Sequence, residues 1–466
     1  MNGRDITELG YREGPIVGLA LRIAQRERKR TDEQNVRKML IAVKDAPAQW
    51  ASDLMWGELA RALIEERDRP YWVEREAPAP YQIWGEGLEE GALMQMRNAV
   101  RLPVATSGAL MPDAHQGYGL PIGGVLGTEN AVIPYAVGVD IACRMKLSVF
   151  DVPASDLERL RESLVRILQR ETAFGTGAEL RRREQHDVMD EDWSVTKITA
   201  RLKDTKAHPQ LGTSGSGNHF VEFGTLTIEK KDLGLEPGSY LALLSHSGSR
   251  GSGAQVAQHY SRLAMDLHPE LPPDLRYLAW LDMDSEPGQE YWAAMNLMGN
   301  YAAANHAVIH RKVAKALGAK VLAGVENHHN FAWKEMHEGK ELIVHRKGAT
   351  PADKNVLGVI PGSMTAPGFI VKGRGEVASV NSAAHGAGRR MSRTAALKSI
   401  SHQVLDEMLA KHGVKLIGGG LDEAPLAYKD IHEVMKSQKQ LVDTVGLFYP
   451  KIVKMDGAVP KQWRKK

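Results

Sequence analysis

Residues 110–145 read LMPDAHQGYGLPIGGVLGTENAVIPYAVGVDIACRM and contain the only cysteine of the chain, Cys143. Asp140 stands three residues before it, and Asp113 and His115 form an Asp-x-His pair near the start of the stretch. A thiolate beside a carboxylate can bind a borderline or soft metal ion, and imidazoles from distant loops can complete its coordination. Taken alone, Cys143 is explained more simply as a small apolar residue of a core strand. The rest of the chain decides between the two.

The composition is that of an ordinary soluble globular protein. The chain has 466 residues, 43% of them hydrophobic, which is enough for a substantial core in one or two domains. Lys and Arg number 60 against 57 Asp and Glu, so a polyanionic partner needs a local basic patch. One cysteine excludes an internal disulfide, and neither an apolar leader nor a run of about 18 apolar residues occurs. We therefore expect a cytoplasmic protein without membrane association.

The first 79 residues read as a charged, helical N-terminal extension. A capping box at Thr31 and Gln34 predicts a helix that runs to Pro47, and a second helix is expected from about Trp50 to Glu66. The charged, Pro-bearing stretch 67–80 is typical of a linker.

Residues 80–466 have a different pattern. Short apolar segments broken by glycine predict buried strands, and amphipathic helices are expected after a capping box at Ser155 and Glu158 and over the tract from Glu290 to Leu317. No βαβ rhythm and no fixed-period repeat is present. The sequence therefore predicts the α+β class, with one large domain of mixed sheet and helix. The segments that predict strands include 123–127, 131–142, 240–251 and 368–373.

Four later segments carry histidines, three of them with glycines crowded around the histidine and one, 326–332, with two adjacent histidines. Glycine lets backbone N–H groups turn toward an anion, and histidine supplies a metal ligand or a nucleophile. Any one of these segments fits a tight turn beside a core histidine, but four together favour a metal site that handles a nucleotide or phosphate. The segments are 211–222, 243–253, 326–332, and 361–368 taken together with 381–393.

From about Pro80 to Gly457 the chain resembles the RtcB family of RNA-splicing ligases. The resemblance rests on the ordered motifs MPDAHQGYG, VGVDIACRM, GSGNHFVE, HSGSRGSG, HHN, VHRKGATPA, IPGSM, HGAGRRMSR and EAPLAYKDI. It implies an enzyme that joins RNA ends bearing a 2′,3′-cyclic phosphate or 3′-phosphate to 5′-hydroxyl ends, using GTP and Mn²⁺, in tRNA splicing or RNA repair. RNA is then the partner, together with a possible activating protein.

The resemblance also implies a ligand set for two Mn²⁺ ions. Asp140, Cys143 and His219 would hold one ion, and Cys143, His246 and His329 would hold the second. Ligand chemistry alone leaves Zn²⁺ at least as good a fit, so the choice of manganese comes from the resemblance. A further histidine of the HGAG motif would be the nucleophile that attacks the α-phosphorus of GTP and becomes guanylated. This nucleophile is His385.

The guanine nucleotide pocket implied by the resemblance draws on several of the same motifs. Its expected residues are Asn218, His219, Phe220, Val221, Glu222, His329, Asn330, Pro361, Gly362, Ser363, Met364, His385, Gly386, Ala387, Gly388, Tyr428 and Lys454. Four basic residues are expected to face RNA phosphates, with a solvated helix face as the alternative for the last of them. They are Arg250, Arg346, Lys347 and Arg389.

Three features depart from the family pattern. Arg144 follows the cysteine where the family usually has glycine, and Gly368 stands where a serine commonly contacts the nucleotide. The third is the N-terminal extension. Two other functions stay open: a metal-dependent phosphohydrolase that opens cyclic phosphates without ligation, and a non-catalytic RNA-binding relative. The phosphohydrolase would not need His385, and the binding relative predicts an eroded ligand set, which is not seen.

Overall fold

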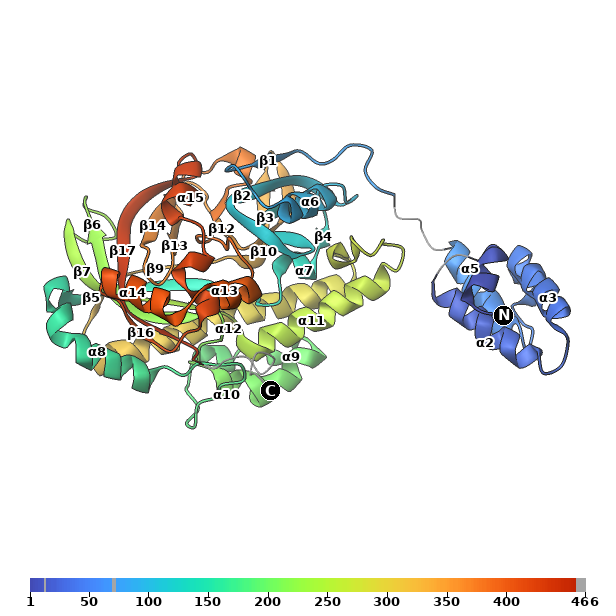
Figure 1. Ribbon diagram of the computed structural model, residues 1–466, viewed down its shortest axis with the longest axis horizontal. Helices are drawn as coiled ribbons and strands as arrows, with labels where there is room; N and C mark the ends of the chain where they lie inside the picture. Colours follow the sequence, from blue (N-terminus) through green and yellow to red (C-terminus); the bar gives the residue numbers. More distant parts are fainter. Residues whose placement is uncertain (12–13, 69–72, 458–466) are drawn as a thin grey trace. The chain divides into compact units, whose positions relative to one another are not determined.

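The computed structural model describes residues 1–11, 14–68 and 73–457, and the chain forms two compact units, Met1–Val73 and the part from Glu74 onward. The first unit is helical and is drawn in blue in Figure 1. Ile23, Leu40 and Leu59 are fully buried in its core. Its helices are α1 (Gly3–Glu8), α2 (Pro15–Glu27), α3 (Glu33–Asp45), α4 (Pro47–Trp50) and α5 (Gly57–Asp68).

Two predicted details of these helices are wrong. Asp32 rather than Thr31 caps α3, because its carboxylate accepts the backbone N–H of Asn35 at 2.9 Å. The helix predicted from about Trp50 onward is divided into α4 and α5. Asp53 causes the break, since its side chain accepts two backbone N–H groups within the connecting turn and so competes with the helical ladder.

The larger unit is built on an eight-stranded sheet with the order β13-β14-β17-β6-β7-β5-β9, in which β16 also pairs with β17. All neighbouring strands are antiparallel except β16 and β17. The strands are β5 (Arg144–Pro153), β6 (Phe220–Ile228), β7 (Gly238–Ser247), β9 (Val321–His328), β13 (Leu357–Ile360), β14 (Gly368–Gly373), β16 (Lys415–Ile417) and β17 (Val442–Met455).

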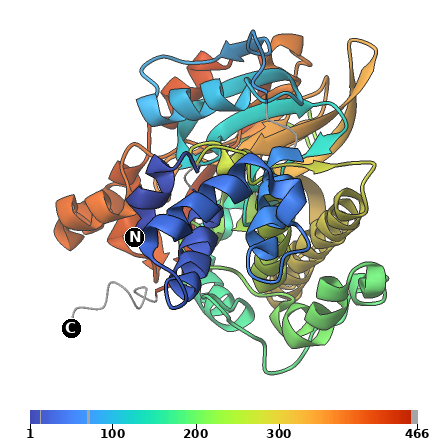
Figure 2. The same ribbon diagram turned by 90° about the vertical axis from the view of Figure 1, so that its right-hand side faces the viewer.

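A second, five-stranded sheet has the order β1-β2-β3-β11-β10. Figure 2 shows it at the top of this unit, with strands in cyan and orange. Its strands are β1 (Tyr81–Ile83), β2 (Ala105–Tyr118), β3 (Leu120–Thr128), β10 (Asn330–His337) and β11 (Lys340–Lys347). Two short pairs complete the strands: β4 (Ala131–Val132) with β8 (Leu281–Asp282), and β12 (Ala349–Pro351) with β15 (Ser382–Ala384).

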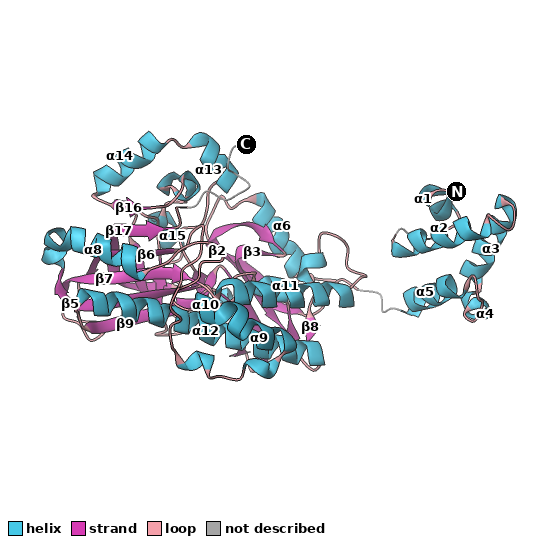
Figure 3. Ribbon diagram, turned by 90° about the horizontal axis from the view of Figure 1, so that it is seen from below, coloured by secondary structure: helices cyan, strands magenta, loops and turns pink. Residues whose placement is uncertain are grey.

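Helices pack against the larger sheet and bury its apolar face. Leu164 of α8 and Ile309 of α12 share one core cluster with Phe150, Phe223 and Leu243 of the strands. In Figure 3, α11 and α12 lie together across this side of the unit. The α-helices of this unit, of which α6 packs on the five-stranded sheet, are α6 (Glu90–Ala99), α7 (Pro134–Val137), α8 (Leu157–Glu171), α9 (Lys197–Leu202), α10 (His208–Gln210), α11 (Arg250–Leu267), α12 (Glu286–Leu317), α13 (Arg393–Ser399), α14 (His402–His412) and α15 (Ile431–Ser437).

The α+β class predicted from the sequence is confirmed, with exceptions in detail. Of segment 131–142, predicted as a strand, only the first two residues pair, because Pro134 begins helix α7. The capping box predicted at Ser155 is absent, and a 3₁₀ turn leads into α8 instead. Helix α12 begins earlier than predicted, at a cap formed by Ser285. Within the described residues, no helix has the length and apolar character needed to cross a membrane.

Candidate active site and metal centre

Loops from four adjacent strands meet at one edge of the eight-stranded sheet. Because neighbouring strands are antiparallel, the starts of β6 and β5 lie beside the ends of β7 and β9. Phe220 pairs with His246, and Arg144 pairs with Ser247 on one side and His328 on the other. The residues brought to this edge are therefore Cys143, His219, His246 and His329.

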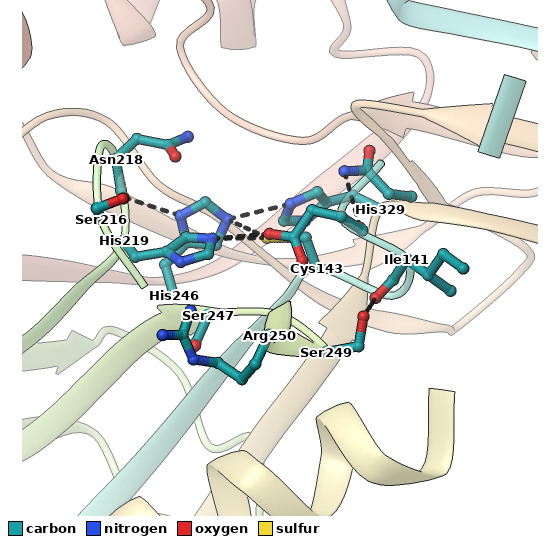
Figure 4. A network of polar contacts seen from close by, with 12 residues as sticks. Ile141, Cys143, Ser216, Asn218, His219, His246, Ser247, Ser249, Arg250 and His329 are labelled. Atoms are coloured by element: carbon teal, nitrogen blue, oxygen red, sulfur yellow. Dashed lines mark hydrogen bonds and ion pairs between the residues drawn. The ribbon is translucent and has the colours of Figure 1, made fainter. Parts of the chain in front are cut away.

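The side chains at this edge converge on one point (Figure 4). The sulfur of Cys143 lies 3.1 Å from Nε2 of His246 and 3.4 Å from Nε2 of His219. Nε2 of His246 is also 3.1 Å from Nε2 of His329, and Nε2 of His219 is 2.9 Å from a carboxylate oxygen of Asp140. One thiol, three imidazoles and one carboxylate thus form a single buried group.

The protonation states of the histidines suit them as metal ligands. Nδ1 of His246 donates to the carbonyl of Asn218 at 3.0 Å, so Nε2 presents its lone pair to the cluster. Burial lowers the pKa of His246 to about 3 and holds that of His329 well below its usual value, so both rings are neutral. Burial raises the pKa of the Cys143 thiol, and a bound cation would displace its proton. The donor set fits a divalent transition metal.

The backbone holds this cluster through bonds between the two loops that carry it. The N–H of Ala142 donates to the carbonyl of Asn330 at 2.7 Å, and the N–H of His329 donates to the carbonyl of Cys143 at 3.0 Å. Glycine is required beside the ligands. A Cβ on Gly248 would lie 2.0 Å from a carboxylate oxygen of Asp140, so the HSGSR motif needs glycine for that carboxylate to reach the cluster.

His385 stands next to the cluster, with its ring centroid 4.8 Å from that of His329. It follows strand β15, and its Nδ1 lies 2.7 Å from a carboxylate oxygen of Asp113 on β2. Nδ1–H therefore donates to the carboxylate, and Nε2 keeps the lone pair that a nucleophile needs. Lys429 steadies the segment around Asp113 by donating to the carbonyls of Pro112 and Ala114 at 3.1 and 2.8 Å.

One cavity of about 1160 Å³ joins the cluster and His385. Most of the residues predicted for the metal site and the nucleotide pocket line it. These are Asp140, Cys143, Asn218, His219, Phe220, Glu222, His246, His329, Asn330, Pro361, Gly362, Ser363, Met364, His385, Gly386, Ala387, Gly388 and Tyr428.

The family model described as tRNA-splicing ligase RtcB matches residues 95–455. The chain belongs to the RtcB family. The RNA-splicing ligase RtcB of Escherichia coli (strain K12) is 34% identical over 406 residues, which covers 79% of this chain and 95% of that protein. The tRNA-splicing ligase RtcB of Nanoarchaeum equitans is 33% identical over 426 residues, covering 76% and 88%. That of Archaeoglobus fulgidus is 32% identical over 417 residues, covering 73% and 86%. The family membership inferred from the ordered motifs is confirmed.

Two residues predicted for the nucleotide pocket of this RtcB protein do not line the cavity. Val221 packs in the core on the opposite face of the sheet. Lys454 pairs with Val221 across the strands and therefore shares its face, and its ammonium donates to the carbonyls of Leu168 and Thr172 at 3.0 and 2.7 Å. The structure thus contradicts the placement of Lys454 at the cavity. Its role is to bind the C-terminal carbonyls of α8.

Arg346 and Lys347, both predicted to face RNA, are successive residues of β11 and therefore lie on opposite faces of their sheet. The prediction for Arg346 is wrong, because its fully buried guanidinium forms a two-bond ion pair with Glu335 at 2.6 and 2.9 Å. Lys347 points the other way and lines the cavity, where burial lowers its pKa to about 7. Arg389 lines the cavity beside Glu423. Arg250 is bound to the Thr213 hydroxyl at 3.1 Å.

Sequence reasoning missed Asp113 as the partner of His385, although its Asp-x-His pair and the MPDAHQGYG motif marked the place. The departures from the family pattern also differ in position. Gly368 lines the cavity, whereas Arg144 does not. The Arg144 guanidinium binds a carboxylate oxygen of Glu326 at 2.5 Å and lies near the carbonyl of Gly299.

Proposed function

We propose that this RtcB-family protein is an RNA ligase that joins 2′,3′-cyclic phosphate or 3′-phosphate ends to 5′-hydroxyl ends, in tRNA splicing or RNA repair in the cytoplasm. The chemistry uses GTP, two Mn²⁺ ions and a guanylated His385. Family membership and the names of the relatives, RNA-splicing ligases, support the ligase activity. The observation that carries the proposal is that one cavity holds both a metal-ligand cluster and a histidine positioned by a carboxylate.

The metal-ligand cluster supports two ions that share the thiolate. Asp140, Cys143 and His219 would hold one Mn²⁺, and Cys143, His246 and His329 would hold the other. Bound divalent ions neutralise phosphate charge and lower the pKa of a coordinated hydroxyl or water. The buried thiol and the neutral imidazoles of His246 and His329, whose Nε2 atoms converge beside it, are what favour a cation here.

His385 has the environment that a nitrogen nucleophile needs. Asp113 accepts a hydrogen bond from Nδ1–H of His385 and would stabilise positive charge on the ring as Nε2 forms a bond to the α-phosphorus of GTP. The bond from that phosphorus to pyrophosphate breaks. The guanylyl group then passes to the RNA 3′-phosphate, and the 5′-hydroxyl displaces GMP.

The rest of the cavity suits a guanine nucleotide. Glu222 lines the cavity, and burial raises the pKa of its carboxyl group well above the usual value. Tyr428 donates its hydroxyl to Glu423, and the Arg389 guanidinium lies 5.3 Å from the centroid of the tyrosine ring. Within the same proposal, residues 80–466 form the catalytic domain, and residues 1–79 form an extension that binds RNA or an activating partner.

Covalent labelling tests the proposal. The full chain is incubated with Mn²⁺ and GTP labelled at the α-phosphate, then denatured and compared with His385→Ala. Label that survives denaturation, is released by acid and disappears in His385→Ala is the expected result, and the surface variant His402→Ala should label as the wild type does. Asp113→Asn should label about 100- to 10,000-fold more slowly, because His385 loses the partner that fixes its tautomer.

A second assay asks whether the chain joins RNA. Opening of a 2′,3′-cyclic phosphate without joining, together with no labelling of a metal-loaded chain, would contradict the ligase and support the phosphohydrolase.

A further inference from the structure

An exposed aromatic patch borders the cavity beside the metal-ligand cluster. Tyr118 lines the cavity and is 66% exposed, and the neighbouring Tyr277 is 37% exposed. Val139, which precedes the ligand Asp140, also lines the cavity and is 42% exposed. Large apolar side chains that are exposed to solvent beside a cavity are typical of ligand-binding sites.

The tyrosines of this patch are held in a fixed arrangement. The ring centroids of Tyr118 and Tyr277 are 5.7 Å apart at an interplanar angle of 68°, and those of Tyr277 and Tyr135 are 4.7 Å apart at 61°. Gly119 makes this contact possible. Its φ is +67°, and a Cβ there would lie 2.7 Å from the carbonyl oxygen of Tyr277. Tyr118 therefore pays little conformational entropy when a planar ligand stacks on it.

A short segment ties the patch to the reacting groups. Lys347 donates to the carbonyl of Tyr118, and its ammonium lies 5.7 Å from the centroid of the Tyr135 ring. The next residue, Gly348, donates its N–H to the carbonyl of His329 at 2.7 Å. The aromatic patch and the metal-ligand cluster thus share one structural support, and the Lys347 amine, whose pKa is about 7, lies at the inner edge of the patch.

We propose that Tyr118, supported by Tyr277 and Tyr135, is a stacking platform for the base of the nucleotide next to a reacting RNA end. Aromatic rings beside a cationic group bind single-stranded nucleic acid, because each base offers a flat face and each phosphate a negative charge. This inference rests on the proposed ligase function. The base is distinct from the guanine of GTP, whose pocket is expected at Glu222 and Tyr428.

The platform selects for bases that stack well. Purines at the bound position are expected to bind better than pyrimidines, and an abasic site should bind worst. Loss of one base–aromatic stack is expected to weaken RNA binding about 5- to 150-fold. The base belongs either to the strand with the 3′-phosphate or to the strand with the 5′-hydroxyl, and the experiment has one arm for each.

The test uses the fluorescent base 2-aminopurine, whose emission falls when it stacks. Two single-stranded oligonucleotides carry it at the terminal nucleotide, one beside a 3′-phosphate and one beside a 5′-hydroxyl, and each is titrated alone with the Mn²⁺-loaded full chain so that no joining occurs. We expect quenching with one of the two. Tyr118→Leu should abolish that quenching and weaken binding of the same strand, whereas Tyr118→Phe should keep both. Tyr449→Leu, an exposed tyrosine outside the cavity lining, is the matched control.

Two outcomes overturn the platform. One is quenching in Tyr118→Leu equal to that of the wild type, and the other is no quenching in the wild type with either strand. Both differ from failure of the ligase proposal, because guanylation of His385 and RNA joining are measured separately. Guanylation in Tyr118→Leu should match the wild type, since that step needs no RNA, and this also shows that the variant is folded.

Discussion

Two histidine clusters lie on opposite faces of strand β7 and differ in whether their ring nitrogens have hydrogen-bond partners. His246 faces the cavity, whereas Ser245 and Ser247 face helix α12, because successive side chains of a strand alternate. His306 and His310 of α12 meet these serines. The first group, with Cys143, is the proposed metal-ligand cluster, and the second, with Ser245 and Ser247, is called the structural cluster.

Every imidazole nitrogen of the structural cluster has a partner. Nε2 of His306 lies 3.1 Å from the carbonyl of Ser247, which only accepts, so Nδ1 of His306 accepts from the Ser245 hydroxyl at 2.6 Å. Ser245 then accepts from Nε2 of His310 at 2.8 Å, and Nδ1 of His310 accepts from Ser148 at 2.8 Å. The hydrogen bonds therefore run in one direction, and both rings are neutral.

The metal-ligand cluster lacks such a pattern. Nδ1 of His219 and Nδ1 of His329 are buried without a hydrogen-bond partner among the described residues, while Nε2 of His246 faces both a sulfur and another Nε2. A buried polar atom without a partner costs about 1–3 kcal/mol. Each nitrogen of the structural cluster is therefore used in a hydrogen bond, whereas the Nε2 atoms of the other group converge on the thiol, as the proposed metal site requires.

The largest difference in Mn²⁺ affinity between variants of the two clusters is expected when the thiol is removed. Cys143→Ser takes away the only soft donor, and we expect Mn²⁺ affinity to fall at least about 100-fold. Ser245→Ala, the matched change in the structural cluster, should alter it less than about tenfold. Calorimetric titration of the metal-free chain measures both. Equal losses in the two variants would show that the clusters are not separate in function.

The reverse experiment removes a ring from the structural cluster. His306→Phe leaves the Ser245 hydroxyl without its acceptor and the Ser247 carbonyl without its donor, so the free energy of unfolding should fall by about 2–4 kcal/mol. Mn²⁺ affinity should stay within about tenfold of the wild type. His329→Phe should do the opposite, with lost metal binding and a smaller loss of stability. Urea unfolding of the metal-free chains, followed by tryptophan fluorescence, measures the stability. A stable His306→Phe that fails to bind metal would contradict the assignment.

The next prediction concerns pH, because acid should weaken metal binding at the metal-ligand cluster. Because burial raises the pKa of the Cys143 thiol, the first metal ion to bind must displace its proton, and the affinity for that ion should rise about tenfold per pH unit through the neutral range. His246 adds nothing there, since its pKa is about 3. Titrations at several pH values give the slope. A slope near zero would mean that Cys143 is not a ligand.

Stability of the metal-free chain should respond to acid through the structural cluster. Burial lowers the pKa of His310 to about 3 from 6.5, so between these values the unfolded chain binds a proton that the folded chain does not. The stabilisation is complete above about pH 6.5 and is lost as the pH falls toward 3, by about 1.4 kcal/mol per pH unit for this group. His310→Asn should flatten the profile measured by urea unfolding at each pH. An unchanged profile would assign the acid sensitivity to other groups.

Sequence motifs predicted a set of metal ligands and His385 that the fold does bring to one cavity, because each of these residues lies in a loop or at a strand end. They could not say which way a side chain points within a strand. Lys454 and Arg346 belong to motifs but face away from the cavity, since one residue of register decides the face. Asp113 was recognisable as a polar residue in an apolar stretch, yet its partner is 272 positions away, and only the fold brings them together.

The smallest effects on stability and nucleotide preference are expected at Arg144, which departs from the family pattern but does not line the cavity. Arg144→Met removes an ion pair, but Glu326 keeps Lys146, whose ammonium lies 2.5 Å from its second carboxylate oxygen. The free energy of unfolding should therefore change by about 1 kcal/mol or less, and the preference for GTP over ATP in His385 labelling should not change.

Gly368→Ser is the matched contrast to Arg144→Met. Gly368 lines the cavity, and a Cβ there would make its closest contact at 3.6 Å, so the serine fits without strain and places a hydroxyl where a nucleotide would bind. A few-fold change in nucleotide preference is expected for Gly368→Ser alone. The same change in Arg144→Met would mean that a residue outside the cavity shapes the nucleotide pocket through strand β5.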